Sequence, residues 1–402
     1  MATEAPRPGI DYRDEALARD PFPIYKRMRE EFPICYLGGK GSHMAVSRYD
    51  DAKQILSDHE TFLSGNDIVG SPEWIEEKYK RDLFILTMEP PEHSRYRALV
   101  SKGFVPKILA ALEPFIQAAA KRLIDQVKDK QSFDFLSEFS LPYAISVISQ
   151  ITGDTAQSVE DLSYWTQLVD KNSFITPDQQ HIEALQKAIL NQYAVYDRII
   201  AERRADRKPG LVTELINARI GDEELTDGDI RAALDLFVSA GFQSSALTLT
   251  NAVHLLSKYP DVFMLLKSKP ELMPAFVDEV VRFNSPAQAL LRHVSRDTAI
   301  NGIHIPKGAL VSVILGSANR DEMKFVNPDE FNIQRSDIKK QIGFGHGVHT
   351  CIGASLARIE VATAVGELVR YFSSVECPAA SELAWTNTLS IRAIKSLPTK
   401  FR

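Results

Sequence analysis

The strongest helical pattern in the chain is the apolar segment Thr226–Lys258. Its first residue is followed three positions later by Asp229, which is a typical N-terminal capping pair, and Pro260 follows the segment as a stop signal. At about 1.5 Å per residue this helix would be close to 50 Å long. Because residues 232–256 are apolar on most sides of the helix, we expect it to pass through the middle of the molecule.

Shorter patterns of the same kind occur throughout the chain. Helical periodicity covers Pro106–Lys128, Glu160–Asp170, Ile182–Arg204, Pro260–Ser268, Glu271–Phe283 and Ile352–Phe372. Strand-like runs are few, and they cover residues 34–38 with 44–48, 299–306, 309–315 and 389–394. The pattern therefore predicts a mainly α protein with a small β region.

Composition places the chain among ordinary globular proteins. Of its 402 residues, 44% are hydrophobic and 25% are charged, which is enough to form a large core. We find no Gly/Ser-rich linker, low-complexity tract or internal repeat, so we expect a single domain over residues 1–402. A net charge of −6 argues against nucleic acid as the main partner. The N-terminus has neither a signal peptide's apolar stretch nor a membrane anchor, so we expect a cytoplasmic protein with no membrane partner.

Three cysteines, at positions 35, 351 and 377, are too few and odd in number for a disulfide framework. Cys351 differs from the others because it ends a loop with three glycines within ten residues. Such a loop can turn sharply and lie against a flat cofactor. The helical run that follows would place unpaired N–H groups near the sulfur and favour the thiolate. A thiolate on haem iron favours cleavage of the O–O bond, so the loop suits an oxygen-activating iron.

This loop resembles the signature of the cytochrome P450 family. The family pattern F-G-x-G-x-H-x-C-x-G is matched here at all of its fixed positions, including Phe344, Gly345, His349, Cys351 and Gly353. The resemblance covers nearly the whole chain and implies that Cys351 is the proximal ligand of haem b (iron protoporphyrin IX). The alternative is a glycine-rich loop that holds a buried cysteine by chance, but agreement at so many positions argues against it.

Two further groups of residues fit the same family. Glu279 and Arg282 stand at i and i+3, so they share a helix face and resemble the family's structural E-x-x-R pair, which Arg335 could join. Haem also carries two propionates, whose burial requires cations or strong donors. By resemblance, the propionate partners are His93, Arg97, Arg292 and His349; for each of them alone, the alternative is a surface charge.

The long helix is where the sequence departs from the family. Residues 240–245 align with the family's A-G-x-[D/E]-T-T, in which small residues leave room for oxygen and the acid and alcohol deliver protons. Here the motif reads Ala240, Gly241, Phe242, Gln243, Ser244 and Ser245. Glutamine can order water but cannot ionise. Three interpretations remain: serines and water carry the protons, a substrate hydroxyl completes the relay, or the reaction needs no full relay.

By resemblance, the substrate pocket is formed by five segments: the loop Phe62–Leu86, the helices and turn around Val169–Pro177, the long helix at Phe237–Ser244, the strand entry Ala287–Leu291 and the late turn Thr388–Ile391. For every such residue the alternative is that it belongs to the plain core. A mainly apolar pocket follows, with polar anchors at Gln243, Gln288, Ser244 and Asn172. Its apolar candidates are Ile68, Val69, Trp74, Ile85, Phe174, Phe237, Leu290 and Ile391.

The resemblance thus implies the family's triangular-prism fold, with a long central helix over the haem. It implies a monooxygenase that hydroxylates or epoxidises a mainly apolar small molecule with O2, in secondary metabolism. We expect a monomer that takes electrons from a separate ferredoxin and its reductase, docked near Arg97, Lys102 and Arg358. The alternatives are an atypical oxidation, such as phenol coupling or a peroxide-driven reaction, and a non-catalytic haem protein such as a gas sensor, an electron carrier or a scaffold.

Overall fold

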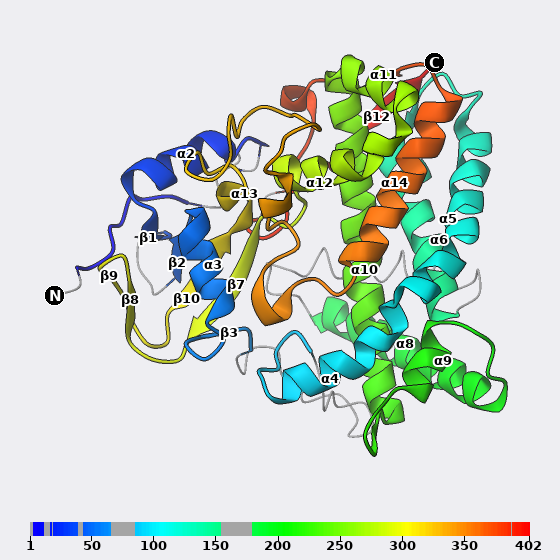
Figure 1. Ribbon diagram of the computed structural model, residues 1–402, viewed down its shortest axis with the longest axis horizontal. Coiled ribbons are helices and arrows are strands. Elements are labelled where there is room, and N and C mark those ends of the chain that lie inside the picture. Colours follow the sequence, from blue (N-terminus) through cyan, green and yellow to red (C-terminus); the bar gives the residue numbers. More distant parts are fainter. Residues whose placement is uncertain are drawn as a thin grey trace.

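A computed structural model of the protein describes residues 3–11, 17, 19–38, 43–65, 85–153, 179–386 and 388–402. Most of the described chain is helical, and a smaller region built on strands lies on the side of the N-terminus (Figure 1). The helices are α2 (Phe22–Glu31), α3 (Tyr49–Ser57), α4 (Glu92–Val100), α5 (Pro106–Val127), α6 (Leu141–Thr152), α8 (Gln179–Ala205), α9 (Leu211–Asn217), α10 (Asp227–Lys258), α11 (Pro260–Ser268), α12 (Met273–Asn284), α13 (Leu315–Ala318) and α14 (Ala354–Tyr371).

Helix α10 forms as the sequence predicts. Thr226 accepts a hydrogen bond from the backbone N–H of Asp229, and the Asp229 carboxylate accepts one from the backbone N–H of Thr226. This capping box satisfies two N–H groups that the first helical turn would leave unpaired. Most of the helix is buried on all sides. By length and composition alone it could span a membrane, but 72% of its apolar window is buried inside the protein, as in the core helix of a soluble protein.

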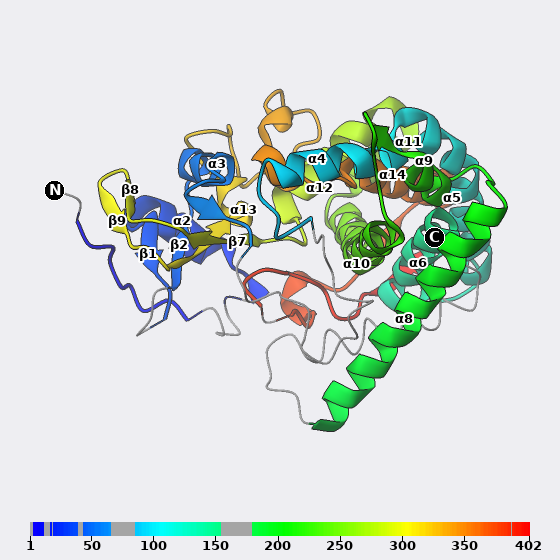
Figure 2. The same ribbon diagram turned by 90° about the horizontal axis from the view of Figure 1, so that it is seen from below.

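Helices α6, α8, α12 and α14 pack around α10, and α5 packs against α6 and α14. Helix α6 packs along α10 on one side, and α14 packs against α10, α5 and α12 on another. Figures 1 and 2 show α10 in the middle of this group, with α14 beside it in both views. The middle of α10 is therefore held against α14, the helix that follows Cys351 in the chain.

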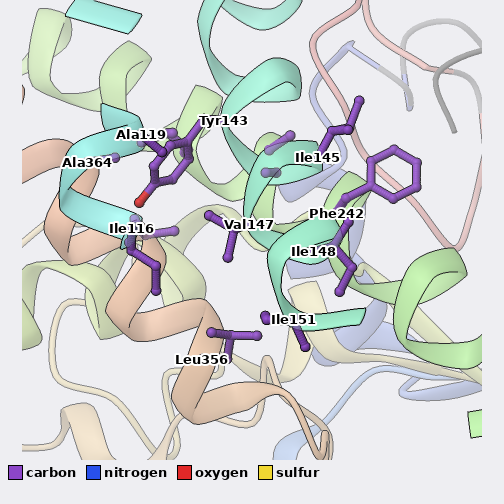
Figure 3. Packing of buried hydrophobic residues seen from close by; sticks show 14 of the residues in the cluster. Ile116, Ala119, Tyr143, Ile145, Val147, Ile148, Ile151, Phe242, Leu356 and Ala364 are labelled. Carbon is purple, nitrogen blue, oxygen red and sulfur yellow. The ribbon is translucent and has the colours of Figure 1, made fainter. Parts of the chain in front are cut away.

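The main core lies between α5, α6, α10 and α14, and its residues are almost all aliphatic or aromatic. Figure 3 shows Ile148 of α6 close to Phe242 of α10, and Leu356 of α14 nearby. Tyr143 of α6 brings a polar group into this core, and its hydroxyl donates to the backbone carbonyl of Glu360 at 2.9 Å. This bond satisfies the buried hydroxyl and ties α6 to α14.

The strand region holds a five-stranded sheet of order β1-β2-β10-β7-β3. Strand β10 is parallel to β2 and antiparallel to β7, with Val313 opposite Leu290 and Val311 opposite Arg292. Because side chains alternate along a strand, Leu290 and Arg292 lie on one face of β7 and Leu291 lies on the other. The sheet strands are β1 (Ile34–Tyr36), β2 (His43–Val46), β3 (Phe62–Leu63), β7 (Ala289–Val294) and β10 (Leu310–Ile314).

The remaining strands are short. Strands β8 and β9 form a hairpin, β5 pairs with β6, and β11, β12 and β4 form a three-stranded sheet. Their bounds are β4 (Phe133–Asp134), β5 (Arg219–Ile220), β6 (Glu223–Glu224), β8 (Thr298–Ile300), β9 (Ile303–Ile305), β11 (Val375–Glu376) and β12 (Pro398–Phe401).

The predicted helices are confirmed wherever the structure describes them, with small changes at their ends. Helix α12 begins at Met273 instead of Glu271 because residues 270–272 form a separate 3-10 turn. The prediction of a strand over residues 389–394 is wrong. This segment makes only isolated bridges, at Ile391 and Ile394, because its backbone groups bond to different partners in turn. The predicted helix at 160–170 lies outside the described residues.

Candidate active site

The loop before α14 is shaped by its glycines and closed by Cys351. The Cys351 N–H donates to the carbonyl of Phe344 at 2.8 Å. Gly345 and Gly347 have φ values of 78° and 76°, which lie in the left-handed region that glycine adopts readily. A Cβ on Gly347 would also come within 2.2 Å of the Leu56 carbonyl oxygen. Glycine at 347 is therefore required by packing against the end of α3.

The surroundings of the Cys351 sulfur act in opposite directions. Burial raises the pKa of the thiol, while hydrogen bonds from the backbone N–H groups of Gly353 and Ala354, and the charges of Arg97 and Arg358, lower it. The N–H groups at the start of the helix thus favour the thiolate as the sequence predicts, but burial outweighs them and the net pKa of Cys351 is raised. One side of the residue remains exposed. A coordinated metal ion would deprotonate the thiol outright.

Arg358 fixes the other end of the loop. Its guanidinium lies 4.4 Å from the centre of the Phe344 ring, and its Nε donates to Asp278 at 2.8 Å. An arginine held between a ring and a carboxylate restricts the rotamers of both neighbours. Phe344 is thereby kept in place beside the thiolate loop.

The predicted propionate partner His93 is buried beside His349, with ring centres 4.2 Å apart. Among the described residues, neither ring nitrogen of His93 has a hydrogen-bond partner. Burial above all, together with the charges of His349 and Arg97, lowers the pKa of His93 to about 4. A neutral imidazole with two unpaired buried nitrogens is costly, so the site is suited to receive a further polar group.

Arg97, Arg292 and His349 gather around the same point. Arg97 donates to the carbonyl of Thr350, next to Cys351. His349 Nε2 lies 3.4 Å from a carboxylate oxygen of Glu89, and the charge of Arg292 also acts on that carboxylate. The structure therefore brings together all four residues that the sequence predicts as propionate partners.

Glu89 is a member of this cluster that sequence reasoning missed. Burial raises its pKa, but hydrogen bonds from His349 and from the backbone of Ser64, with the charge of Arg292, more than offset this, so the net pKa is lowered. Its position directly before Pro90 and Pro91, at the entry to α4, is the signal that could have identified it.

The middle of α10 is exposed on one side, whereas most of the rest of the helix is buried. We call residues 240–244 the open part of α10. Ala240 and Ser244 are exposed and Gly241 and Gln243 are partly exposed, whereas the helix around them is buried. The Ser244 hydroxyl donates to the Ala240 carbonyl at 2.7 Å. A Cβ on Gly241 would lie only 3.2 Å from Ile148 Cδ1, so the small residue also suits the packing of α6. This part of α10 forms an open, weakly polar surface.

Ser245 points elsewhere. It is buried, and its hydroxyl acts as a hydrogen-bond donor to the carboxyl of Glu360 on α14. Residues 244 and 245 are thus divided between the open surface and the interface between α10 and α14. Because Glu360 lies on α14, this contact holds α10 against the helix that follows Cys351.

Together these residues fit a flat cofactor with one metal and two carboxylates. Cys351 offers an accessible sulfur, and the open part of α10 carries small or uncharged side chains against which a flat group could lie. The unpaired nitrogens of His93, with Arg97 and Arg292, offer donors for two carboxylates. The donor set is that required by haem held through a thiolate.

Glu279 and Arg282 form a fully buried, two-pronged ion pair at 2.7 and 2.8 Å. Arg335 also bonds to Glu279, at 3.0 Å to its second oxygen. The rest of the Arg282 guanidinium donates to the carbonyls of Asn319, Pro328 and Glu330. The pairing that the i, i+3 spacing predicts is therefore observed, and Arg335 joins it.

The predicted substrate residues are placed unevenly. Ile85, Phe237 and Gln288 are buried, and the Gln288 amide donates to the carbonyl of Ser285 at 2.6 Å. Leu290 lies beside the thiolate loop, because a Cβ on Gly345 would be 3.5 Å from its Cδ1. Ile391 is 39% exposed. The other candidates, Ile68, Val69, Trp74, Asn172 and Phe174, lie outside the described residues.

Comparison with known proteins agrees with a mainly helical protein that holds haem through a thiolate. The family model described as "Cytochrome P450" matches residues 18–269 and 264–400. Cytochrome P450 107B1 of Saccharopolyspora erythraea is 31% identical, over 96% of this chain and 96% of its own. The structure of CYP109Q5 from Chondromyces apiculatus has a TM-score of 0.88 at 29% identity and covers 98% of each chain.

A further structure, CYP109E1 from Bacillus megaterium in complex with corticosterone, has a TM-score of 0.85 at 28% identity and covers 96% of this chain and 99% of its own. These neighbours confirm the expected mainly helical fold with its small β region. Cytochromes P450 bind haem and act as monooxygenases. The chain therefore belongs to the cytochrome P450 family.

Proposed function

We propose that this monooxygenase oxidises a mainly apolar small organic molecule, with Cys351 as the proximal ligand of its haem. The observation that supports this most directly is the open stretch of α10, whose residues 240–244 carry only small, apolar or uncharged side chains. Such a surface binds a substrate mainly through contact with apolar groups. The corticosterone complex of CYP109E1 supports a molecule of steroid size as a first candidate.

In this proposal the chain holds the haem, orients the substrate and manages protons. Haem bound through a thiolate supplies the redox chemistry that activates dioxygen. His93, Arg97, Arg292 and His349 would hold the two propionates by charge-assisted hydrogen bonds. The N–H groups of Gly353 and Ala354 already point at the sulfur and would stabilise its negative charge.

The substrate wall can be tested on β7, where neighbouring residues face opposite ways. Leu290→Phe enlarges a side chain beside the thiolate loop, whereas Leu291→Phe enlarges one on the other face of the strand. We expect Leu290→Phe to weaken corticosterone binding by at least about ten-fold, measured by the shift of the ferric haem spectrum. Leu291→Phe should leave the titration unchanged. Equal effects of the two variants would contradict the proposed wall, and no shift by corticosterone or other apolar ligands would contradict the substrate class.

For the electron donor, we propose a ferredoxin that docks on the face of α4 and the turn after it. Arg97 already donates to the Thr350 carbonyl and Arg358 to Asp278, so Lys102, exposed in that turn, is the more available cation. We expect Lys102→Glu to slow reduction by a ferredoxin and to flatten its dependence on salt. Lys26→Glu, on the distant helix α2, is the control. Equal reduction rates for the two variants would contradict the proposed docking surface. A cytoplasmic location is also part of the proposal.

A further inference from the structure

Gln288 and Arg392 are two buried side chains that lie outside the set of residues that hold the haem. Gln288, at the entry to β7, is 1% exposed, and Arg392, in the segment before β12, is 6% exposed. The sequence predicts Gln288 as a polar anchor for the substrate. Its amide nitrogen, however, donates to the Ser285 carbonyl at 2.6 Å, so this end of the amide is already satisfied within the protein.

Each of these two side chains carries one polar atom without a partner among the described residues. In Gln288 this atom is Oε1, an acceptor, and in Arg392 it is Nε, a donor. An unpaired polar atom in the interior is costly, so most such atoms in folded proteins bind another protein group or an ordered water. One water molecule can accept from a donor and donate to an acceptor, so it could satisfy both atoms at once.

A small cavity is lined by both side chains. Its volume is about 10 Å³, which is close to the space that one water molecule requires. The lining also includes the hydroxyl-bearing side chains of Tyr25, Thr386 and Thr388. A buried water needs two to four polar partners, and this cavity offers them.

The guanidinium of Arg392 is held in one orientation by its other contacts. Its two terminal nitrogens donate to Asn284 Oδ1 and to the carbonyl of Arg19, both at 2.8 Å. Its central carbon lies 3.5 Å from the centre of the Trp385 ring. Burial lowers the pKa of Arg392 to about 10, so the group still carries its charge at neutral pH. A charged donor in a fixed orientation binds a water more strongly than a neutral donor does.

The same two residues hold the late turn at 388–391 against the start of β7. The N–H of Gln288 donates to the Ser390 carbonyl at 2.8 Å. The N–H of Arg392 donates to the Pro286 carbonyl, also at 2.8 Å. A water shared by the two side chains would add a further link between these segments, and this link would depend on which side chains stand at positions 288 and 392.

We propose that Gln288 and Arg392 share one buried water, and that this bridge sets the position of the turn at 388–391 and with it the substrate wall. The inference rests on the proposed function and deepens it, because Ile391 of this turn is a predicted substrate residue. Gln288 is then a positioning residue and not a polar anchor for the substrate. It acts through the turn, so it affects which molecules fit the pocket and not the chemistry of the haem.

The first test requires neither substrate nor turnover. In a crystal structure of the haem-loaded protein that shows ordered water, we expect one water within about 2.7–3.2 Å of both Gln288 Oε1 and Arg392 Nε. It should be absent from Gln288→Met, a variant of similar length whose thioether is only a weak acceptor. A cavity without water in the wild type, or a direct bond between the two side chains, would overturn the bridge whatever the enzyme oxidises.

The second test measures how ligands fit the pocket. Clotrimazole binds ferric haem through its imidazole and fills the pocket with its aromatic rings, whereas imidazole alone contacts little beyond the iron. In titrations followed by the haem spectrum, we expect Gln288→Met to weaken clotrimazole binding by at least about five-fold and imidazole binding by less than about two-fold. Gln192→Met, which removes a buried glutamine of α8 that also has an unpaired amide atom, is the matched control and should change neither. Equal effects of Gln288→Met on the two ligands, or none, would contradict a role in the substrate wall.

A double-mutant cycle tests whether the two side chains act through one water. Arg392→Lys keeps a long basic side chain but loses the Nε donor, so it should weaken clotrimazole binding about as much as Gln288→Met does. The two changes together should weaken it by no more than about two-fold beyond either one alone, because a shared bridge can be broken only once. Effects that multiply would show independent roles and overturn the proposal.

If Arg392→Lys does not fold, the crystallographic water and the two affinities of Gln288→Met still decide the question. Failure of the proposed function would be seen separately, as a wild-type haem spectrum that imidazole shifts but that corticosterone and other apolar ligands do not.

Discussion

His93 shows how a single residue can reveal what a site is built to hold. Its imidazole is buried to 1% exposure and kept neutral, yet it has no partner for either nitrogen among the described residues. Leaving two such groups unpaired costs about 1–3 kcal/mol each. A bound group that pairs with these nitrogens would offset this cost. Removal of the His93 side chain should therefore not lower the stability of the haem-free protein, but should lower the stability of the haem-loaded protein.

We therefore expect His93→Leu to leave the haem-free protein as stable as the wild type, or more stable, and to weaken haem binding. Loss of one hydrogen bond to a charged group, worth about 1.5–3 kcal/mol, corresponds to about a 10- to 100-fold faster loss of haem to an acceptor protein. His304→Leu, which changes an exposed histidine of β9, is the control. Equal rates of haem loss for the two variants would show that His93 does not hold the cofactor.

The stability of the folded protein should also report on Glu360. Its pKa is about 8 in the native state and about 4.5 in the unfolded chain, so the unfolded state releases its proton first as the pH rises. The stability associated with the neutral acid is full below pH 4.5 and is lost as the pH rises towards 8. Glu360→Gln removes this titration. The variant's urea midpoint should therefore exceed that of the wild type by an amount that grows between pH 5 and pH 8.

The urea midpoints should be measured at several pH values with the haem bound in each protein. Glu367→Gln changes a paired carboxylate on the same helix, and it should not become more stable than the wild type at any of them. Curves for Glu360→Gln and wild type that run parallel would rule out the raised pKa.

At the scale of single residues, the sequence identified those residues that belong to a recognisable motif. Cys351, His93 and Arg97 stand at fixed spacings, so their positions could be inferred from the printed residues. Glu89 and Glu360 could not, because what distinguishes them is burial and the choice of partner. Neither property has a local pattern in the sequence, since both depend on helices that meet far apart along the chain.

Among the elements, α10 was predicted best because local signals and packing agree on it. Its N-terminal capping box, its apolar length and the proline after it are all readable from the residues. The hydrophobic pattern missed strand β7 because Arg292 and His293 interrupt it, and only the family resemblance indicated a strand entry, at Ala287–Leu291. Residues 389–394 were assigned wrongly because an apolar run need not find one continuous partner. Strand prediction fails here since pairing is a long-range property.

The capping box of α10 gives a prediction that belongs to the element alone. Thr226→Ala removes the side-chain acceptor for the Asp229 N–H, so we expect a loss of about 1 kcal/mol in the free energy of unfolding. The open stretch of the helix lies four turns away, so the haem spectrum should not change. Thr226→Ser keeps the hydroxyl and should restore most of the stability in urea titrations. A spectrum altered by Thr226→Ala would contradict the idea that the cap acts only on the start of the helix.

For the molecule as a whole, the Glu279 network joins segments that are distant in sequence. Glu279 of α12 binds Arg282 of its own helix, Arg335 and the backbone N–H of Asn332, while Arg282 reaches the carbonyls of Asn319 and Pro328. The network thus fixes the long irregular segment between α13 and the thiolate loop, where few regular backbone hydrogen bonds are available. Glu279 is the counter-charge of Arg282 and one of two for Arg335, which also pairs with Asp337.

Breaking this network should therefore affect the whole protein. Glu279→Gln keeps the shape of the side chain but leaves Arg282 buried without a counter-charge and Arg335 with Asp337 alone, at an expected cost of about 3–5 kcal/mol. That is a large part of a typical domain's stability, so the yield of soluble, haem-loaded protein should fall sharply. Arg27→Ala, which breaks the exposed pair Arg27–Glu31 on α2, should change neither the yield nor the unfolding midpoint measurably. If Glu279→Gln instead gave wild-type yields with an unchanged midpoint, the irregular segment before Cys351 would have to be held by its packing alone, and the buried charges would not be needed for its stability.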